Sequence, residues 1–289
     1  MQSKVLVTGS VGFLGHHLTK KLSSLGYHTI GVDNLSNGDE KYATLSDVFL
    51  QQDVGTLTAD DLNGIDYVFH TAALPRVPYS IEHPIETHDS NVNQTLSLLI
   101  AARDAGVKKV IYSSSSSVYG GQNHYPSNED DQTIPLSPYA VQKLTGELYT
   151  EVFRAVYGLP TASLRYFNIY GEEQRADNPY TGVLTRFLSM RAAKGLLTIY
   201  GTGEQRRDFT YVGDVVDANI LAAEKGLGVY NVGMGKNYSI NEVARAVGGV
   251  PIVYGDARRG DPMISLADNR RLLDLGWKPK MDLMTWLTK

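Results

Sequence analysis

Three side chains in the middle of the chain have the types and spacing needed to move a hydride. Tyr139 and Lys143 stand four positions apart in the run YAVQK (139–143), and Ser115 lies 24 residues before Tyr139. On a helix, positions i and i+4 share one face, so the Lys143 ammonium would lie beside the Tyr139 ring and favour its phenolate form. A phenol normally titrates near ~10, too high for a base at neutral pH. Ser115, at the end of a predicted strand, could hydrogen-bond the substrate oxygen that Tyr139 deprotonates.

The start of the chain decides how this spacing is interpreted. YxxxK also arises by chance on amphipathic helices, and a serine-rich segment such as 113–117 is typical of a polar turn after a strand. Here, however, residues 4–7 predict an apolar strand that runs into TGSVGFLG (8–15), with leucines at helical spacing behind it. Gly9 permits the tight turn, Gly12 lets the backbone approach a pyrophosphate, and Gly15 lets helix and strand pack closely. The spacing departs from GxGxxG, but the flanking elements predict a dinucleotide site.

An acidic residue follows the second predicted strand and indicates which dinucleotide binds. Residues 28–32 form that strand, and Asp33 ends it 18 residues after Gly15. A carboxylate there can accept hydrogen bonds from both ribose hydroxyls and would repel a 2′-phosphate, which favours NAD over NADP. The plainer alternative is a structural turn followed by a solvated aspartate. The coincidence of glycines, strand and acid argues against that alternative.

The elements that must position these residues alternate along the chain. Such alternation predicts an α/β fold with a Rossmann-type doubly wound parallel sheet and a smaller C-terminal substrate-binding lobe. We assign 1–169 to the NAD-binding domain, with a strand and helix at 209–225 returning to it, and 170–289 mainly to the lobe. The predicted strands are 4–7, 28–33, 48–52, 67–71, 109–114 and 161–167, and the longest predicted helices are 91–105 and 138–157.

Composition excludes several classes of protein. The 289 residues carry a formal net charge of −4, which gives no electrostatic reason to expect nucleic acid or an anionic membrane as a partner. The absence of cysteine rules out disulfides, thiolate catalysis and cysteine–zinc sites. Metal sites built on histidines and carboxylates remain possible in principle, but the seven histidines show neither HxxxH nor HExxH, so we predict none. No apolar run approaches 18 residues and no signal peptide precedes the first strand, so we expect a cytoplasmic protein.

The two longest predicted helices bear on the oligomeric state. The apolar faces of 91–105 and 138–157 would need partners beyond the sheet. Two such helices that pair with their copies would form a four-helix interface, so we predict a homodimer. The alternative is a monomer in which both helices pack only on the sheet.

Motifs in a fixed order run through almost the whole chain. With them the chain resembles the extended short-chain dehydrogenase/reductases and, within these, the UDP-sugar 4-epimerases. The resemblance implies an NAD-dependent isomerase that acts on a UDP-sugar. The motifs are TGSVGFLG, VDNLSNG (32–38), FHTAA (69–73), NVNQT (91–95), YSSSSSVYG (112–120), YAVQK, RYFNIYG (165–171), LTIYG (197–201), RRDFTYVGDV (206–215) and RRGDPMISLAD (258–268).

The resemblance also implies roles for residues around the cofactor. Asp33, Asn34 and Asn37 would hold the adenosine ribose. Asp53 would bind the adenine amine, and Asn93 would lie near the nicotinamide. Lys143 would hydrogen-bond the nicotinamide ribose as well as tune Tyr139. The other implied NAD contacts are Gly9, Gly12, Phe13, Leu14, Gly15, Val54 and Ala72.

For the substrate, the resemblance implies a clamp on the nucleotide. Asn168 would contact the first phosphate, while Thr198 and Tyr200 would border the uracil. Arg207 and Arg258 would grip the diphosphate, which suits guanidinium because it presents paired planar donors and stays charged. The uridine ribose contact would be Asp261.

The two residues that follow Ser115 differ from those of related enzymes that catalyse other reactions on nucleotide sugars. The related 4,6-dehydratases carry an Asp-Glu pair after the catalytic hydroxyl residue, and UDP-glucuronate decarboxylases usually carry Glu in the second position. Here these positions are Ser116 and Ser117, so elimination and decarboxylation are disfavoured and epimerisation remains. Tyr139 would then take the proton of the sugar 4-hydroxyl and Ser115 would steady the carbonyl that forms.

The sugar itself is less well determined. A large aromatic residue at the position of Ser265 would restrict the pocket to glucose and galactose, whereas the small serine implies that N-acetylhexosamines also enter, unless it faces elsewhere. Arg76 and Arg186 could instead pair with a substrate carboxylate, which makes a UDP-glucuronate 4-epimerase the alternative. A non-catalytic NAD-binding regulatory or scaffold protein is a second alternative. The complete set of three catalytic side chains argues against it.

Overall fold

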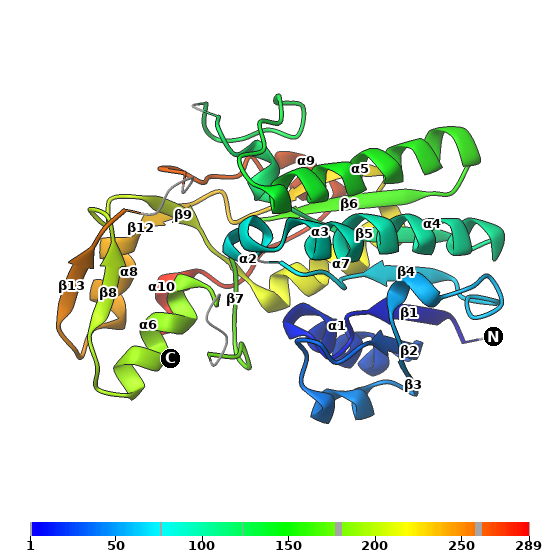
Figure 1. Ribbon diagram of the computed structural model, residues 1–289, viewed down its shortest axis with the longest axis horizontal. Coiled ribbons are helices and arrows are strands. Elements are labelled where there is room, and N and C mark those ends of the chain that lie inside the picture. Colours follow the sequence, from blue (N-terminus) through cyan, green and yellow to red (C-terminus); the bar gives the residue numbers. More distant parts are fainter. Residues whose placement is uncertain (1, 76, 123, 177–180, 258–261, 289) are drawn as a thin grey trace.

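The computed structural model describes residues 2–75, 77–122, 124–176, 181–257 and 262–288 (Figure 1). Within these ranges, seven parallel strands form one large sheet in the order β11-β6-β5-β4-β1-β2-β3. The chain runs outward from β1 to β3 and then crosses back to β4, which confirms the predicted doubly wound sheet. The strands are β1 Lys4–Thr8, β2 His28–Asp33, β3 Val48–Gln51, β4 Tyr67–His70, β5 Lys109–Ser115, β6 Thr161–Tyr166 and β11 Gly228–Val232.

Helices cover both faces of this sheet, as a parallel sheet with buried strands requires. The side chains of β1 alternate, so that Val5 and Val7 face one core and Leu6 faces the other. The first core is closed by α1 (Phe13–Ser24), α7 (Val212–Lys225) and α9 (Arg270–Leu275). The second is closed by α4 (Gln94–Asp104) and α5 (Pro138–Tyr157), which lie side by side in Figure 1.

A smaller lobe with its own core lies at the left of Figure 1, beyond the carboxyl ends of the strands. Its strands form short pairs, β8 with β13, β9 with β12, and β7 with β10. The bounds are β7 Ile169–Tyr170, α6 Val183–Ala192, β8 Leu197–Tyr200, β9 Arg206–Asp208, β10 Thr210–Tyr211, β12 Asn237–Ser239, α8 Ile240–Val247, β13 Ile252–Gly255 and α10 Leu283–Leu287.

Short helical segments connect several of these elements. None of the helices in the described ranges is long and apolar enough to cross a membrane. The segments are η1 Glu40–Leu45, η2 Val54–Thr56, α2 Val77–Glu82, α3 Pro84–His88, η3 Asp89–Asn93 and η4 Ser116–Tyr119.

The sequence predicted most elements within a residue or two, with two differences. The helix predicted for 91–105 begins as the π-turn η3 and continues as α4. The strand predicted near 209–212 is β10, which pairs with β7 rather than with the large sheet, whereas α7 does pack on that sheet. The seventh strand of the large sheet is instead β11. Its sequence GVYNV begins with glycine and contains Asn231, so it looks like a loop, although Asn231 is fully buried and hydrogen-bonded.

Candidate active site

A cavity of about 1080 Å³ opens along the carboxyl ends of the strands, between the sheet and the lobe. Its walls come from the segments that follow β1, β2, β4, β5 and β6, from the first turns of α5 and from the lobe. The sheet order reverses between β1 and β4, and ligands of open α/β sheets bind beside such a point. Motifs that are far apart in the sequence therefore share one cavity.

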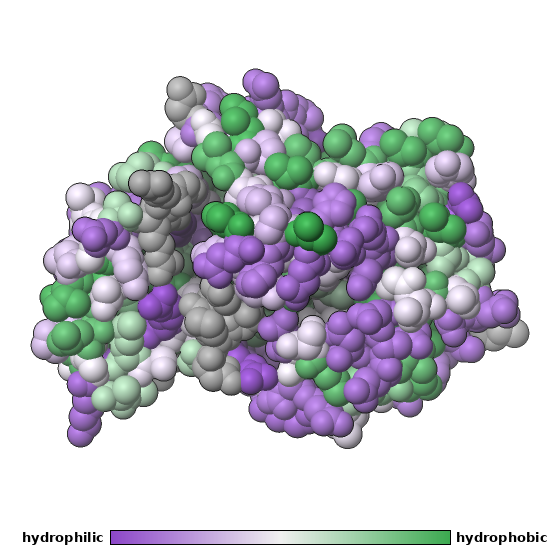
Figure 2. Space-filling view, in the orientation of Figure 1, coloured by the Kyte–Doolittle hydropathy of each residue, from purple (hydrophilic) through white to green (hydrophobic). Residues whose placement is uncertain are grey.

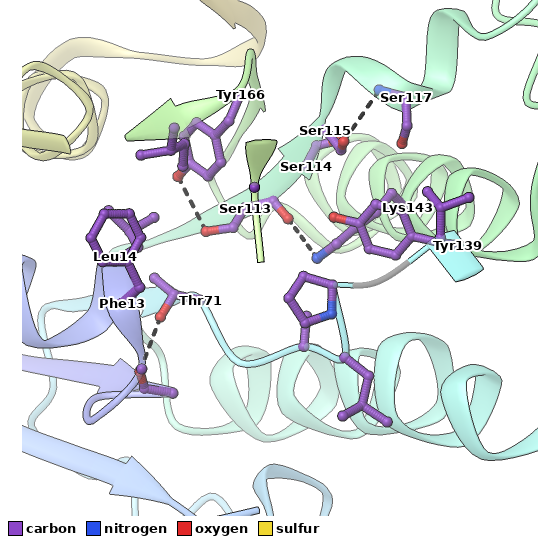
Figure 3. Close-up of a pocket in the computed structure, with 18 of the residues that line it drawn as sticks. Phe13, Leu14, Thr71, Ser113, Ser114, Ser115, Ser117, Tyr139, Lys143 and Tyr166 are labelled. Carbon is purple, nitrogen blue, oxygen red and sulfur yellow. Dashed lines mark hydrogen bonds between the residues drawn. The ribbon is translucent and has the colours of Figure 1, made fainter. Parts of the chain in front are cut away.

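The three predicted catalytic side chains lie together in this cavity (Figure 3). Ser115 is the last residue of β5, and Tyr139 and Lys143 lie in the first turns of α5. Ser137 begins that helix by accepting a hydrogen bond from the Ala140 backbone N–H at 3.2 Å, and a proline occupies its first position. The Nζ atom of Lys143 donates to the Ser113 carbonyl at 2.8 Å and lies 5.9 Å from the centre of the Tyr139 ring.

Burial controls the protonation of both groups in this structure. Tyr139 is 8% exposed, and burial raises its pKa to about 12, although a hydrogen bond with Ser115 works in the opposite direction. Burial also lowers the pKa of Lys143 to about 7, opposed by the negative charge of Glu147. The spacing alone suggested that the Lys143 charge would favour the phenolate. Here the removal of both groups from water dominates, so the phenol keeps its proton at neutral pH.

The lowered pKa of Lys143 predicts how stability changes with pH. Between pH 7 and about 10.5 the unfolded chain holds the Lys143 proton and the folded chain does not, so stability rises with pH across this window. Lys143→Met removes the cost of burying a charge. We expect the cofactor-free variant to be more stable than the wild type at pH 7, with an advantage that shrinks by at most about 1.4 kcal/mol per pH unit above it.

Urea unfolding of both proteins at several pH values measures this difference. Lys20→Met serves as the control, because it removes a lysine that is exposed to solvent on α1. An advantage of Lys143→Met that stays constant or grows between pH 7 and 10 would contradict the prediction.

The glycine turn fits a dinucleotide. Gly9 has a φ of +66°, which favours glycine, and a Cβ atom on Gly15 would lie 1.9 Å from the Gly9 carbonyl oxygen. Asp33 ends β2 at the cavity wall, where its carboxylate accepts hydrogen bonds from the backbone of Val11 at 3.3 Å and of Leu35 at 2.9 Å. Burial raises its pKa, and both hydrogen bonds oppose that shift. These contacts fix the carboxylate at the strand end, where a ribose can be bound.

Most of the other predicted cofactor residues also line the cavity, with two exceptions. Asp53 is not among the lining residues; it is exposed and accepts a hydrogen bond from Asn34 at 2.7 Å. The exposed Asn93 donates to Asp89 at 2.7 Å, and its neighbour Gln94 lines the cavity instead. The predicted residues that do line it are Gly12, Phe13, Leu14, Asn34, Asn37, Val54 and Ala72.

Some of the predicted substrate residues line the cavity and others do not. Asn168, Arg207 and Ser265 line the cavity, and the Asn168 side chain donates to the Asp208 carbonyl at 2.8 Å. Thr198 and Tyr200 lie on β8 and are not among the lining residues. The remaining predicted substrate residues, Arg76, Arg258 and Asp261, lie outside the described residues.

Several lining residues carried no signal in the sequence. Gln122, Tyr125 and Ser127 come from the segment between β5 and α5, and they line the same cavity as Ser115. The Oγ atom of Ser117 and the Oε1 atom of Gln122 are buried without a protein hydrogen-bond partner. Buried polar atoms without a partner in a cavity wall are ready to bind a polar ligand such as a sugar.

A buried ion pair behind the catalytic residues was also missed. Arg165 on β6 and Glu147 on α5 have side chains that are 5% and 4% exposed, and they share three hydrogen bonds, at 2.7 Å, 2.9 Å and 3.2 Å. Arg165 also donates a hydrogen bond to the Tyr119 hydroxyl oxygen at 2.8 Å. Ser114 donates to Glu147, so the pair connects the end of β5 to α5 one turn beyond Lys143.

A glycine turn with Asp33 behind it and a Ser115, Tyr139 and Lys143 group beside it define an NAD-dependent enzyme of hydride chemistry. The chain belongs to the NAD dependent epimerase/dehydratase family, whose sequence model matches residues 5–233. This match confirms the family predicted from the motifs and the cofactor.

Known relatives resemble this chain over nearly its whole length. A putative UDP-glucose 4-epimerase of Methanocaldococcus jannaschii is 34% identical over 288 residues, which cover 96% of this chain and 94% of the relative. The solved UDP-N-acetylglucosamine 4-epimerase from Methanobrevibacter ruminantium M1, in complex with UDP-N-acetylmuramic acid, is 37% identical, with a TM-score of 0.94 and coverage of 99% and 96%. The UDP-glucose 4-epimerase from Thermotoga maritima with UDP-glucose is 35% identical, with a TM-score of 0.94 and coverage of 98% and 96%.

Proposed function

We propose that this protein is a UDP-hexose 4-epimerase that interconverts UDP-glucose and UDP-galactose, and also UDP-N-acetylglucosamine and UDP-N-acetylgalactosamine. The observation that carries the proposal is that Ser115, Tyr139 and Lys143 line one cavity together with the glycine turn and with residues of the lobe. The relatives, which are named as 4-epimerases of UDP-sugars, support the same substrate class. The cytoplasmic location stays a prediction of the sequence.

In the proposed mechanism the protein moves one proton and holds the nucleotide. The glycine turn and Asp33 would hold NAD, which would supply the hydride chemistry at carbon 4 of the sugar. Tyr139 takes the proton of the 4-hydroxyl and gives it back, while Ser115 donates a hydrogen bond to the oxygen as it becomes a carbonyl. The positive charge of an oxidised nicotinamide would favour the Tyr139 phenolate, which burial disfavours in this structure.

Inversion requires the keto sugar to turn about its bond to the diphosphate. The nucleotide must stay fixed during this turn, and Arg207 and Asn168 in the lobe half of the cavity suit that task. Ser116 and Ser117 provide neither the acid nor the base that loss of water from the sugar would need. The side chains on this wall therefore favour epimerisation over elimination.

The proposal is tested by proton NMR of the purified chain with UDP-galactose, UDP-N-acetylgalactosamine and UDP-galacturonate in separate samples. Conversion of the first two to their gluco epimers is the expected result. Conversion of the galacturonate alone would favour the uronate alternative. No conversion of any of them, even with added NAD, would overturn the proposal.

The uronate alternative has little support from the described residues. It relied on Arg76, which lies outside them, and on Arg186. Arg186 lines the cavity with its guanidinium over the Tyr200 ring, 5.7 Å from the ring centre, whereas the relatives named as 4-epimerases of UDP-glucose and UDP-N-acetylglucosamine favour a hexose substrate. We therefore keep the UDP-hexose substrate as the proposal.

Ser265 provides a test of sugar size. It lines the cavity beside Ile264, and its small side chain leaves room that a tyrosine would fill. We expect Ser265→Tyr to lower kcat/KM for UDP-N-acetylgalactosamine at least about tenfold while kcat/KM for UDP-galactose stays within about twofold. Ser265→Ala, which keeps the space, should leave both values near the wild type. Equal losses for both substrates in Ser265→Tyr would show that the residue does not select by size.

We further propose a homodimer formed through α4 and α5. Four apolar side chains at intervals of seven, four and four residues lie on one face of α5 and are at least 45% exposed: Val141, Leu148, Val152 and Val156. Figure 2 shows apolar residues along the upper right of the molecule, over this helix. Ile100 on the adjacent α4 is also exposed. An apolar stripe of this length on two neighbouring helices suits a four-helix interface with a second copy.

Charge placed in this stripe should separate the subunits. We expect Leu148→Glu with Val152→Glu to shift the protein from dimer to monomer in sedimentation velocity at micromolar concentration, because four like charges would meet in the interface. Leu196→Glu is the control, since Leu196 is exposed on the lobe, away from α5. A monomeric wild type, or a dimeric double variant, would contradict the proposed interface.

A further inference from the structure

Two histidines and a glutamate from distant parts of the chain meet at the cofactor end of the cavity. His16 and His17 follow the glycine turn on α1, and Glu173 lies in the segment after β7. The Nε2 atom of His16 lies 3.1 Å from Oε2 of Glu173, and Nε2 of His17 lies 3.9 Å from the same oxygen. All three donor atoms lie within 4.8 Å of one another.

The sequence patterns predicted no metal site, but from this cluster we propose that the three side chains bind a divalent transition-metal cation such as Zn²⁺. Zinc binds imidazole nitrogens and carboxylate oxygens at about 2.0–2.2 Å, so two of its ligands in a tetrahedral site lie about 3.4 Å apart. The separations of 3.1 Å and 3.9 Å fall on either side of this value. Three protein ligands leave the fourth position to water.

The orientation of His16 supports a cation between the rings and the carboxylate. Its Nδ1 atom lies 2.8 Å from the Gly12 carbonyl oxygen, which can only accept, so Nδ1 carries the proton. The Nε2 lone pair of the neutral ring then faces the Glu173 carboxylate, and two acceptors 3.1 Å apart need a proton or a metal ion between them. The His16 side chain is 1% exposed, and the His17 ring lies beside it with ring centres 4.2 Å apart, so both imidazoles lie on the same side of the carboxylate.

The contacts of the His16 ring resemble those that orient a histidine ligand in a metal site. A histidine that binds a metal usually donates its other ring N–H to a carbonyl or carboxylate, which is the role of Gly12 here. The His16 ring also stacks on Tyr42, with ring centres 3.9 Å apart and planes within 5°. These contacts fix the direction of the Nε2 lone pair before any ion binds.

The segment that carries Glu173 is held in place from the lobe side. Glu173 has a φ of +62°, a conformation that few residues other than glycine adopt without strain. Its neighbour Glu172 accepts hydrogen bonds from Tyr211 at 2.9 Å and from Trp286 at 2.7 Å. His17 would exchange its present 3.1 Å hydrogen bond to the Glu172 carbonyl for the ion. Metal binding would then tie the lobe to the glycine turn at the cavity wall.

The test is a titration of the untagged, full-length chain with Co²⁺, whose visible absorption reports coordination. The chain has no cysteine, so thiolates cannot contribute to the bands. We expect saturation at one ion per chain and displacement of Co²⁺ by Zn²⁺. Glu173→Gln should weaken Co²⁺ binding at least about tenfold, and His17→Asn should do the same, because each removes a ligand.

The variants have a matched control elsewhere on the surface. His28 lies 3.4 Å from Asp47 in an ordinary pair that lacks a second histidine, so His28→Asn should leave Co²⁺ affinity unchanged. Glu173 is 44% exposed and should tolerate glutamine without loss of fold, which circular dichroism can verify. Absence of saturable binding, or equal affinity in the wild type and both ligand variants, would overturn the proposal. This site does not depend on the proposed epimerase reaction.

Discussion

Replacing Tyr139 with phenylalanine is expected to lower kcat for UDP-galactose by about 10²–10⁴-fold. Among the three catalytic side chains, the phenol is the one suited to take a proton from the sugar hydroxyl and return it, since an aliphatic hydroxyl such as that of Ser115 is a weaker acid and Lys143 donates to the Ser113 carbonyl. Phenylalanine keeps the ring that packs in the cavity, so NAD should still bind. Coupled kinetics measures the turnover, and protein fluorescence quenching measures NAD binding.

Tyr157→Phe is the matched control for this change. Tyr157 lies at the other end of α5 and is 51% exposed, so the loss of its hydroxyl should leave turnover within about twofold of the wild type. Full turnover in Tyr139→Phe would remove the catalytic role and favour the scaffold alternative. Loss of NAD binding together with turnover would show instead that the variant damages the cavity.

The catalytic residues could be predicted from sequence because local signals fix their positions. Gly9 takes the positive φ that the turn after β1 requires, and Pro138 with Ser137 starts α5 where Tyr139 and Lys143 come onto one face. Parallel strands end at the same edge of the sheet, so residues that follow different strands must meet there. The alternation of strand and helix patterns along the sequence therefore predicted the parallel sheet. The residues that follow each strand predicted where the cavity would lie.

What the sequence did not show depends on contacts made only in the folded chain. The pKa shifts of Tyr139 and Lys143 come from burial, and the spacing of two residues on a helix carries no information about their exposure. His16 and Glu173 are 157 residues apart, so no local pattern could indicate that they meet. The strand β11 was missed because its buried polar residue finds partners in distant segments.

The pair of Arg165 and Glu147 is another such contact, and it predicts a large loss of stability. Glu147→Ala would leave the Arg165 guanidinium, 5% exposed, without its counter-charge, which costs about 3–5 kcal/mol in the free energy of unfolding. Urea unfolding at pH 7 with the same NAD concentration for every variant measures the loss, since bound ligand adds to apparent stability. Glu151→Ala breaks the exposed pair with Arg154 on the same helix and should cost less than about 1 kcal/mol.

A double variant distinguishes the stability lost with the ion pair from the cost of leaving the Arg165 charge buried without a partner. Glu147→Leu with Arg165→Met replaces both charges by apolar groups, so we expect it to be more stable than Glu147→Ala, although Ser114 and Tyr119 each lose a partner. If Glu147→Ala cost no more than Glu151→Ala, the pair would not be a structural connection. Because Ser114 precedes Ser115 and Glu147 lies one turn after Lys143, a loosened pair should also disturb the two walls that hold the catalytic groups. Such a double variant should therefore recover stability more fully than it recovers turnover.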